Sequence, residues 1–583
     1  KNTKKINTEI RGNYTFNYRN HKNIRVSITG EKNQPKILIE AIDSTNLKSK
    51  LEENKLTFYS EKGNFRASGN ILTNEINGKY QDSTGTFYDY KMIRDSLFIE
   101  KEDEIKKLVI KKIPTIWSPN KSNGLQKELK AKTILFKNAT LWTNEDLGII
   151  KSADIAISNG KIVAIGESLD TTQIPNYENL DLQILDVKGK HLTTGIIDEH
   201  SHIAISNGVN ESSQSVTAEV SISDVINPED HNIFRQIASG VTCSQLLHGS
   251  ANPIGGQSAL IKLRWGKSAE EMKIQNTDGF IKFALGENVK QSNWGSFNTT
   301  RFPQTRMGVE QVFYDAFYRA KDYKKNWEKY NSLSTRQKRE TDPPREDLEL
   351  NTLVEILEGK RHITCHSYVE SEINMLMHVA DSMGFKINTF THILEGYKVT
   401  EKLKKHSAGA STFADWWAYK FEVNDAIPYN ASILNNAGVV TAINSDDAEM
   451  GRRLNQEAAK AIKYGGTSEE DAWKMVTLNP AKLLRLDNKM GSLKVGKDAD
   501  IVIWSGNPLS IYSKVEQTYI DGICYFDNKE QQLNQERDLK EKMRIINKLS
   551  RSKSKSKIKH KPKKDILYHC DTIEHEHNHD HDH

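Results

Sequence analysis

The sequence predicts an α/β protein in which a (β/α)8 TIM-like barrel is joined to a composite β-sandwich domain and preceded by an N-terminal all-β domain. Three observations predict this architecture. Short β-type runs fill residues 1–120, and two further β-rich segments lie at 131–192 and 487–528. Between those two segments, over 193–486, strand-like runs alternate with helical runs, and eight such strands can be counted. This alternation is typical of parallel βα units, and eight units close into a barrel of about 250 residues.

Composition excludes several other classes of protein. The chain has 583 residues, of which 37% are apolar and 27% charged, so it can bury a globular core. No stretch approaches the roughly 18–20 apolar residues of a membrane span. The four cysteines are too few to hold a chain of this length together by disulfides. The chain begins at Lys1 without an apolar leader, so we expect an incomplete N-terminus. The compartment stays open, with a periplasmic or secreted location favoured over a cytoplasmic one.

The two β domains follow from local patterns. In the N-terminal domain, alternating or β-branched runs are separated by turn signals such as Ile76-Asn-Gly-Lys, which favours an antiparallel sandwich or open barrel with an accessory role. In 131–192 a hairpin is expected across Asn159-Gly160, and 487–528 contains a matching pair of strands. We therefore expect these two segments to form one domain closed around the inserted barrel.

The barrel is expected to lie within 193–486. Its surplus length is in 293–350, an insertion with a helical stretch over Val309–Tyr330. The predicted strands are Gly195–His202, Val241–His248, Ala259–Trp265, Phe280–Leu285, His362–Ser367, Lys386–His392, Ala408–Phe413 and Val439–Asn444.

Charge separates the remaining segment, 529–583, from the body of the protein. Residues 537–564 have a net charge of +11, residues 565–583 have −6, and the first 536 residues are neutral overall. A neutral body does not favour nucleic acid as a partner. The basic stretch is rich in Lys and Ser and is expected to be disordered. The histidines that alternate with acidic residues after it indicate metal affinity.

Five side chains at predicted strand ends indicate a metal centre. His200 and His202 end the first strand and, by alternation, face the same side. His366 ends the fifth strand, His392 ends the sixth, and Asp446 follows the eighth. The carboxyl ends of barrel strands form the active-site face. Imidazole and carboxylate are ligands of zinc, manganese and iron.

Beyond these residues, the sequence resembles the amidohydrolase superfamily over about 131–528. The resemblance rests on Gly195-Ile-Ile-Asp-Glu-His-Ser-His, the isolated His366 and His392, Ser445-Asp446, Asn479-Pro-Ala and Lys494-Val-Gly-Lys-Asp-Ala-Asp. Within the superfamily, the chain is most similar to imidazolonepropionase-like and Xaa-Pro-dipeptidase-like members. Leu247-His-Gly-Ser-Ala-Asn-Pro-Ile-Gly-Gly-Gln resembles a bacterial subgroup of large proteins.

The resemblance implies one or two divalent ions, with zinc expected and manganese or iron as alternatives. His200 and His202 would hold one ion, and His366 and His392 would hold a second. Asp446 would contact metal and act as the catalytic acid–base group. A lysine at the end of strand four often bridges the ions in this superfamily. Lys282 is the favoured candidate, with Glu287 as the competing bridge.

Other candidates surround this set. His248 ends strand two and is a candidate catalytic group, and Gln257 follows in the Gly-rich loop at the same face. Arg264 and Arg306 could bind a substrate carboxylate through a bidentate fork. Tyr368 and Tyr397 follow two of the histidines closely and are candidates for the substrate pocket.

The leading functional prediction is a metal-dependent hydrolase of carbon–nitrogen bonds, acting on a small cyclic amide or a dipeptide through a metal-activated hydroxide. Two alternatives stay open: a mononuclear deaminase of a nitrogen heterocycle, and a non-catalytic metal-binding protein. The expected partner is a small-molecule substrate. A homo-oligomer is left open.

Overall fold

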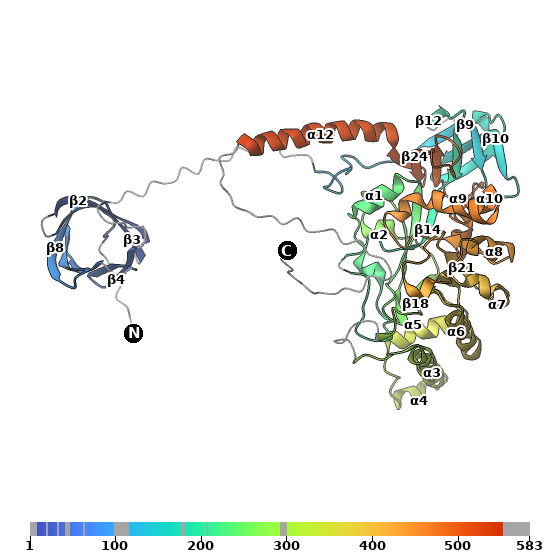
Figure 1. The fold of residues 1–583 in the computed structure, drawn as a ribbon, viewed down its shortest axis with the longest axis horizontal. Coiled ribbons are helices and arrows are strands. Elements are labelled where there is room, and N and C mark those ends of the chain that lie inside the picture. Colours follow the sequence, from blue (N-terminus) through green and yellow to red (C-terminus); the bar gives the residue numbers. More distant parts are fainter. Residues whose placement is uncertain are drawn as a thin grey trace. The chain divides into compact units, whose positions relative to one another are not determined.

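The computed structural model describes residues 9–18, 21–31, 34–40, 47–61, 65–97, 116–175, 181–206, 208–291 and 300–551. The chain divides into two compact units, Lys1–Pro114 and Thr115–His583 (Figure 1). Among the described residues, no helix combines the length and apolar character needed to cross a membrane.

The first unit is an all-β structure, as the sequence predicted. Its antiparallel sheet has the order β3-β2-β1-β8-β7-β6-β5-β4. The two end strands, β3 and β4, also contact each other, so the sheet curls almost into a barrel (Figure 1). Its core includes Phe16, Phe58 and Tyr90. The strands are β1 (Gly12–Tyr18), β2 (His21–Glu31), β3 (Gln34–Ile39), β4 (Leu47–Glu52), β5 (Lys55–Ser60), β6 (Phe65–Ile71), β7 (Glu75–Asp82) and β8 (Phe87–Leu97).

In the second unit, one sheet contains two segments that lie far apart in the sequence. Its order is β11-β10-β9-β13-β23-β24-β25, and β12 also pairs with β9. The segments meet where β13 runs antiparallel to β23, with His191 opposite Trp504. The strands are β9 (Thr133–Trp142), β10 (Ile149–Ser158), β11 (Lys161–Gly166), β12 (Leu182–Asp186), β13 (His191–Thr194), β23 (Ile501–Trp504), β24 (Val515–Ile520) and β25 (Ile523–Asp527).

Parallel strands form most of the barrel wall. β14 pairs with β15, and β18 to β22 pair in sequence order, all in parallel. β22 also lies against β14, which brings the two ends of the wall together. The carboxyl ends of these strands therefore meet at one mouth. The strands are β14 (Ile196–Ser201), β15 (Val241–Leu246), β18 (Gly279–Ala284), β19 (Arg361–Ser367), β20 (Thr389–His392), β21 (Gly409–Thr412) and β22 (Thr441–Ile443).

The third strand position is filled in the opposite direction. β16 (Ile254–Gln257) pairs antiparallel with β18, and β17 (Ala259–Lys262) pairs antiparallel with β15. The prediction of a parallel strand over Ala259–Trp265 was therefore wrong. A parallel crossover needs a dozen or more residues, but only residues 247–253 separate β15 from β16, so the chain turns back directly from the end of β15. Consequently residues 247–253, between β15 and β16, lie at the mouth, the Gly255-Gly256 pair lies within β16, and the residues after β17 lie at the opposite end.

Helices lie around the outside of the barrel, and a long helix, α12, follows the last strand of the second unit (Figure 1). The helix expected over Val309–Tyr330 is α3. In 529–583, the expectation of disorder was wrong as far as Arg551, because α12 continues to that residue; the stretch is rich in good helix formers. The predicted His-rich tail lies outside the described residues. The helices are α1 (His231–Ile237), α2 (Ala269–Met272), α3 (Arg306–Asn331), α4 (Thr335–Arg339), α5 (Leu348–Leu357), α6 (Glu370–Met383), α7 (Thr400–His406), α8 (Asn430–Asn436), α9 (Leu454–Gly465), α10 (Glu469–Lys474), α11 (Leu478–Leu483) and α12 (Asn528–Arg551).

Candidate metal centre and active site

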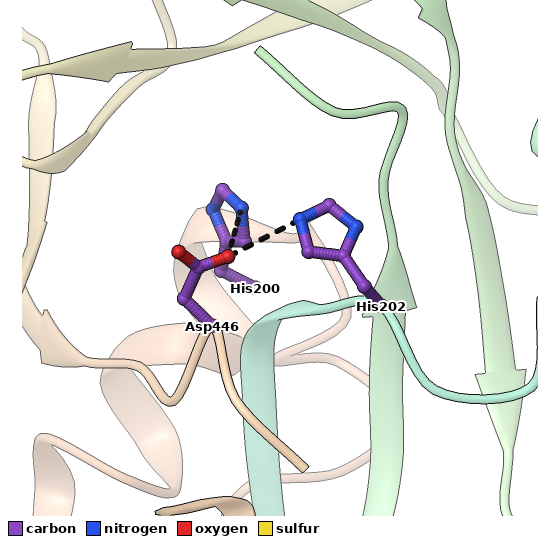
Figure 2. A group of neighbouring side chains, drawn as sticks. All are labelled: His200, His202 and Asp446. Atoms are coloured by element: carbon purple, nitrogen blue, oxygen red, sulfur yellow. Dashed lines mark ion pairs between the residues drawn. The ribbon is translucent and has the colours of Figure 1, made fainter. Parts of the chain in front are cut away.

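Four histidines and one aspartate converge at the mouth of the barrel, all of them buried. Asp446 Oδ1 lies 3.3 Å from Nε2 of His200 and 3.2 Å from Nε2 of His202 (Figure 2). The other carboxylate oxygen of Asp446 lies 3.6 Å from Nε2 of His392. The rings of His366 and His392 are 4.9 Å apart, measured between centroids. Side chains from β14, β19, β20 and the end of β22 thus form one cluster.

Irregular backbone aims these side chains into the barrel. The register of β14 against β15 shifts between Asp198 and Ser201, which marks a β-bulge or a similar irregularity. His392 has a φ of 67° and Asp446 a φ of 53°, in the left-handed region that residues other than glycine rarely adopt. Such outliers concentrate at functional sites, where the surrounding structure holds them in place.

Hydrogen bonds between the first and last strands hold Asp446 in position. The backbone N–H of Asp446 donates to the carbonyl oxygen of His200 at 3.0 Å. Ser445 Oγ donates to Asp198 Oδ2 at 2.6 Å, and the Ser445 N–H donates to the other Asp198 oxygen at 3.1 Å. The backbone at Ser445 and Asp446 is therefore tied to the strand that supplies His200 and His202.

The protonation states of this cluster suit a divalent metal. Burial lowers the pKa of His200 and His202, and the nearby Lys282 acts in the same direction at His200. Burial alone would raise the pKa of Asp446, but His392 and His200 hold it well below its usual range. Neutral imidazoles and an ionised carboxylate are the forms that bind metal. The ligand atoms of His200, His202 and Asp446 all lie within 4.8 Å of one another, so this donor set fits a zinc-like ion.

The two candidate bridging residues differ in position. Lys282 is buried on β18, and its Nζ lies 2.9 Å from Nε2 of His200. Glu287 follows the end of β18, and its backbone N–H donates to Glu422 Oε2 at 2.9 Å. Of the two, Lys282 is therefore the residue that reaches a proposed ligand.

His248 is buried beside the mouth, but backbone groups occupy both of its ring nitrogens. The N–H of Glu211 donates to His248 Nε2 at 2.7 Å, and His248 Nδ1 lies 2.9 Å from the carbonyl oxygen of Gly249, to which it donates. Burial lowers the pKa of His248 to about 4, so the ring is neutral near pH 7. This geometry lets His248 hold two loops together, and its catalytic role stays a prediction.

The reversed third strand removes two predicted substrate-binding residues from the mouth. Arg264 follows β17 at the opposite end of the barrel, where its Nε donates to Asp521 Oδ2 at 2.8 Å. Gln257, at the end of β16, donates from Nε2 to the hydroxyl of Thr352 on α5 at 3.1 Å. Both side chains thus stabilise the scaffold.

Arg306 and Tyr397 are also engaged by the protein itself. Arg306 pairs with Glu372 and, at 3.3 Å, with Glu422. The hydroxyl of Tyr397 donates to the carbonyl oxygen of Asp425 at 3.0 Å. Neither contact is directed at the proposed metal ligands.

Tyr368 is the predicted pocket residue that the structure brings to the cluster. Its ring centroid lies 4.6 Å from that of His366 and 5.7 Å from that of His392. Tyr419 donates a hydrogen bond of 2.7 Å to the Tyr368 hydroxyl, and Lys420 Nζ lies 4.3 Å from the Tyr368 ring centroid. Tyr368 thus forms an aromatic wall beside the histidines.

Sequence reasoning missed buried polar residues beneath the ligands. Glu199, Thr391 and Asn444 are all buried, and Thr391 Oγ1 lies 3.0 Å from His200 Nδ1. Burial raises the pKa of Glu199 to about 8. The available signal was a polar residue beside a ligand in each strand: Glu199 before His200 and Thr391 before His392. Strict alternation assigned these neighbours to the opposite face.

A solved structure decides the family. The crystal structure of an amidohydrolase from Thermotoga maritima MSB8 is 33% identical to this chain; the match covers 68% of this chain and 100% of that protein, with a TM-score of 0.61. The chain belongs to the amidohydrolase family. The amidohydrolase family model itself matches residues 423–526.

Two further relatives extend the comparison. The amidohydrolase tasK of Hapsidospora irregularis is 31% identical over 436 residues; the match covers 68% of this chain and 43% of tasK, so this amidohydrolase spans less than half the length of that relative. An imidazolonepropionase of Thermoplasma volcanium is 22% identical over 384 residues, covering 61% of this chain and 85% of that protein. The resemblance to imidazolonepropionases expected from the motifs is thus confirmed.

Proposed function

We propose that this amidohydrolase is metal-dependent and hydrolyses a carbon–nitrogen bond of a small cyclic amide or a dipeptide. The observation that carries the proposal is the approach of two buried imidazole Nε2 atoms, from His200 and His202, to one oxygen of Asp446 at 3.2–3.3 Å. A divalent ion held there would lower the pKa of water to about 7 and would polarise a substrate carbonyl. Zinc is the expected ion, with manganese or iron as alternatives, because imidazole and carboxylate suit all three.

The residues have distinct roles in this proposal. His200, His202 and Asp446 would hold the first ion, and His366 and His392 would complete the site. Asp446 would also take a proton from the attacking water on a carboxylate oxygen and deliver it to the leaving nitrogen. The buried wall around the histidines would exclude bulk water from the substrate, which strengthens electrostatic interactions there.

The first test is a substrate screen of the full-length, zinc-loaded protein. We expect hydrolysis of at least one member of a library of dipeptides and cyclic amides, with loss of activity on chelation and recovery on addition of zinc. Mass spectrometry would identify the two products. Release of ammonia from a nitrogen heterocycle would favour the deaminase alternative. Bound zinc without hydrolysis of any dipeptide or cyclic amide and without ammonia release would favour a non-catalytic metal-binding protein.

The second test separates the bridging candidates by metal content. We expect Lys282→Ala to lose one of two bound ions, and short carboxylates added to the buffer to restore part of the activity, because they can occupy the vacated position. Glu287→Gln should keep both ions, since the backbone of Glu287 is held by Glu422 and not by the histidine cluster. The reverse ranking would assign the bridge to Glu287, and equal, small losses would indicate a mononuclear site.

A further inference from the structure

A layer of polar side chains lies inside the barrel directly beneath the proposed ligands. Hydrogen bonds identify it as interior, because they join strands that are not neighbours in the wall. Thr391 on β20 contacts residues of β14, and Gln245 on β15 lies 3.4 Å from Thr364 on β19. Barrel interiors are usually filled by branched apolar side chains. The buried members of this polar layer are Glu199, Gln245, Lys282, Thr364, Thr391, Ser411 and Asn444.

Thr391 is the centre of the hydrogen bonds in this polar layer. Its Oγ1 lies 3.0 Å from Nδ1 of His200 and 3.4 Å from Oε2 of Glu199. The amide nitrogen of Asn444 donates to the same Oγ1 at 3.3 Å. Glu199 and His200 are consecutive residues, and both reach Thr391 because the strand register is irregular at this point. The local backbone thus turns a carboxyl group inward that strict alternation would turn outward.

The proton count at Thr391 determines the direction of each hydrogen bond. A metal on Nε2 of neutral His200 requires the proton on Nδ1, so Nδ1–H must donate to Thr391 Oγ1. Asn444 also donates to this oxygen, so the single hydroxyl proton of Thr391 needs an acceptor. Glu199 Oε2 is the acceptor within reach. It accepts whether the carboxyl group is ionised or carries a proton on its other oxygen.

We propose that Glu199 is a positioning residue which, through Thr391, holds His200 in the tautomer and orientation that present Nε2 to the metal. The inference rests on the proposed metal dependence. Outer groups that accept from a ligating histidine fix its tautomer, and their loss typically weakens metal affinity by about 10–100-fold. Glu199 also hydrogen-bonds Ser411 and lies within the electrostatic reach of Lys282, but its link to the His200 ring runs through Thr391.

The test measures zinc affinity of full-length variants by competition with a chelator. The double variant His200→Ala/His202→Ala defines zinc bound elsewhere in the chain, and its isotherm is subtracted. We expect Glu199→Leu and Thr391→Val each to weaken zinc binding by about 10–100-fold. Glu199→Gln and Thr391→Ser, which keep an acceptor and a hydroxyl respectively, should stay within about threefold of wild type. A Glu199→Leu/Thr391→Val double variant should bind zinc no more weakly than the weaker-binding single variant. Both substitutions interrupt the same series of hydrogen bonds, so their effects do not add.

Thr364→Val is the matched control. It removes a hydroxyl from the same polar layer, but this hydroxyl is hydrogen-bonded to Gln245 and not to a proposed metal ligand. It should bind zinc within about threefold of wild type. Thermal melting checks that each variant is folded. If Glu199→Leu does not fold, the zinc affinity of Thr391→Val tests the proposal by itself. Wild-type affinity in both Glu199→Leu and Thr391→Val would overturn this inference alone. A wild-type protein that binds no more zinc than the His200→Ala/His202→Ala background would overturn it together with the proposed function.

Discussion

Replacing Asp446 by asparagine is expected to lower kcat by at least about 100-fold, the usual contribution of a general base. Asparagine keeps the size of the side chain and tolerates the left-handed φ of 53° found at this position. It loses the charge that faces His200, His202 and His392 at 3.2–3.6 Å. The fold and at least one ion should persist. The measurement is kcat on a substrate found in the screen, with metal content determined in parallel.

Asp447 is the control for this substitution, because it is adjacent and acidic but has another task. Its Oδ1 accepts hydrogen bonds from the backbone N–H groups of Glu449 and Met450, at 2.9 and 2.8 Å. We expect Asp447→Asn to stay within about tenfold of wild type, a barrier change of about 1.4 kcal/mol. An inactive Asp447→Asn with an active Asp446→Asn would reverse the assignment. Full activity in both would refute the proposed mechanism.

The second large effect is expected at the opposite end of the barrel. Lys262, which ends the reversed strand, is buried and its Nζ lies 2.7 Å from Asp498 and 2.9 Å from Asp500, and it also pairs with Asp521. Lys262→Met would leave the buried Asp500 without its cation, which should cost about 3–5 kcal/mol of unfolding free energy. Lys161→Met is the control, because half-exposed Lys161 also pairs with Asp498 and should cost about 1 kcal/mol or less.

Tryptophan fluorescence during urea unfolding suits this comparison, because the first tryptophan of the chain is Trp117 and the signal reports only on the second unit. Burial already raises the pKa of Asp500 to about 6, and loss of Lys262 should raise it further. A carboxyl group whose pKa is raised in the folded state lowers the free energy of unfolding as the pH rises, because the unfolded chain releases its proton more readily. The loss in Lys262→Met should therefore be smaller at pH 5 than at pH 8. Equal losses in the two lysine variants would contradict this account of the cluster.

The positions of most barrel strands could be predicted from the local sequence pattern alone. Buried apolar runs alternating with helical runs indicate parallel βα units, and this predicted β14, β15 and β18–β22 within a few residues. The direction of the third strand depends instead on the length of a connection, and an apolar run gives no direction. Helix α12 was missed because a Lys-rich composition suits both a solvated helix and a disordered tail.

Site residues could be predicted where the residue type and its position at a strand end were enough to place the side chain. They could not be predicted where an irregular backbone or a partner far along the chain determines the direction or the contacts of the side chain. His200 and His202 were found as a pair, but the irregularity that turns Glu199 inward breaks the alternation rule that assigned side chains to the faces of the strand. Arg264 and Arg306 looked like carboxylate-binding residues because nothing in the sequence reveals that Asp521 and Glu372 neutralise them. Partners this far apart along the chain become visible only once the chain is folded.

The zinc content of the full-length protein tests the central claim most directly. Wild type and the His200→Ala/His202→Ala variant would be loaded with zinc, desalted and measured by elemental analysis. The difference between them isolates the barrel site from other zinc-binding segments. Our account predicts that wild type holds about one to two more zinc ions per chain than the variant, since a catalytic zinc site needs about three protein ligands and the substitutions remove two. Equal zinc content in the two proteins would contradict it.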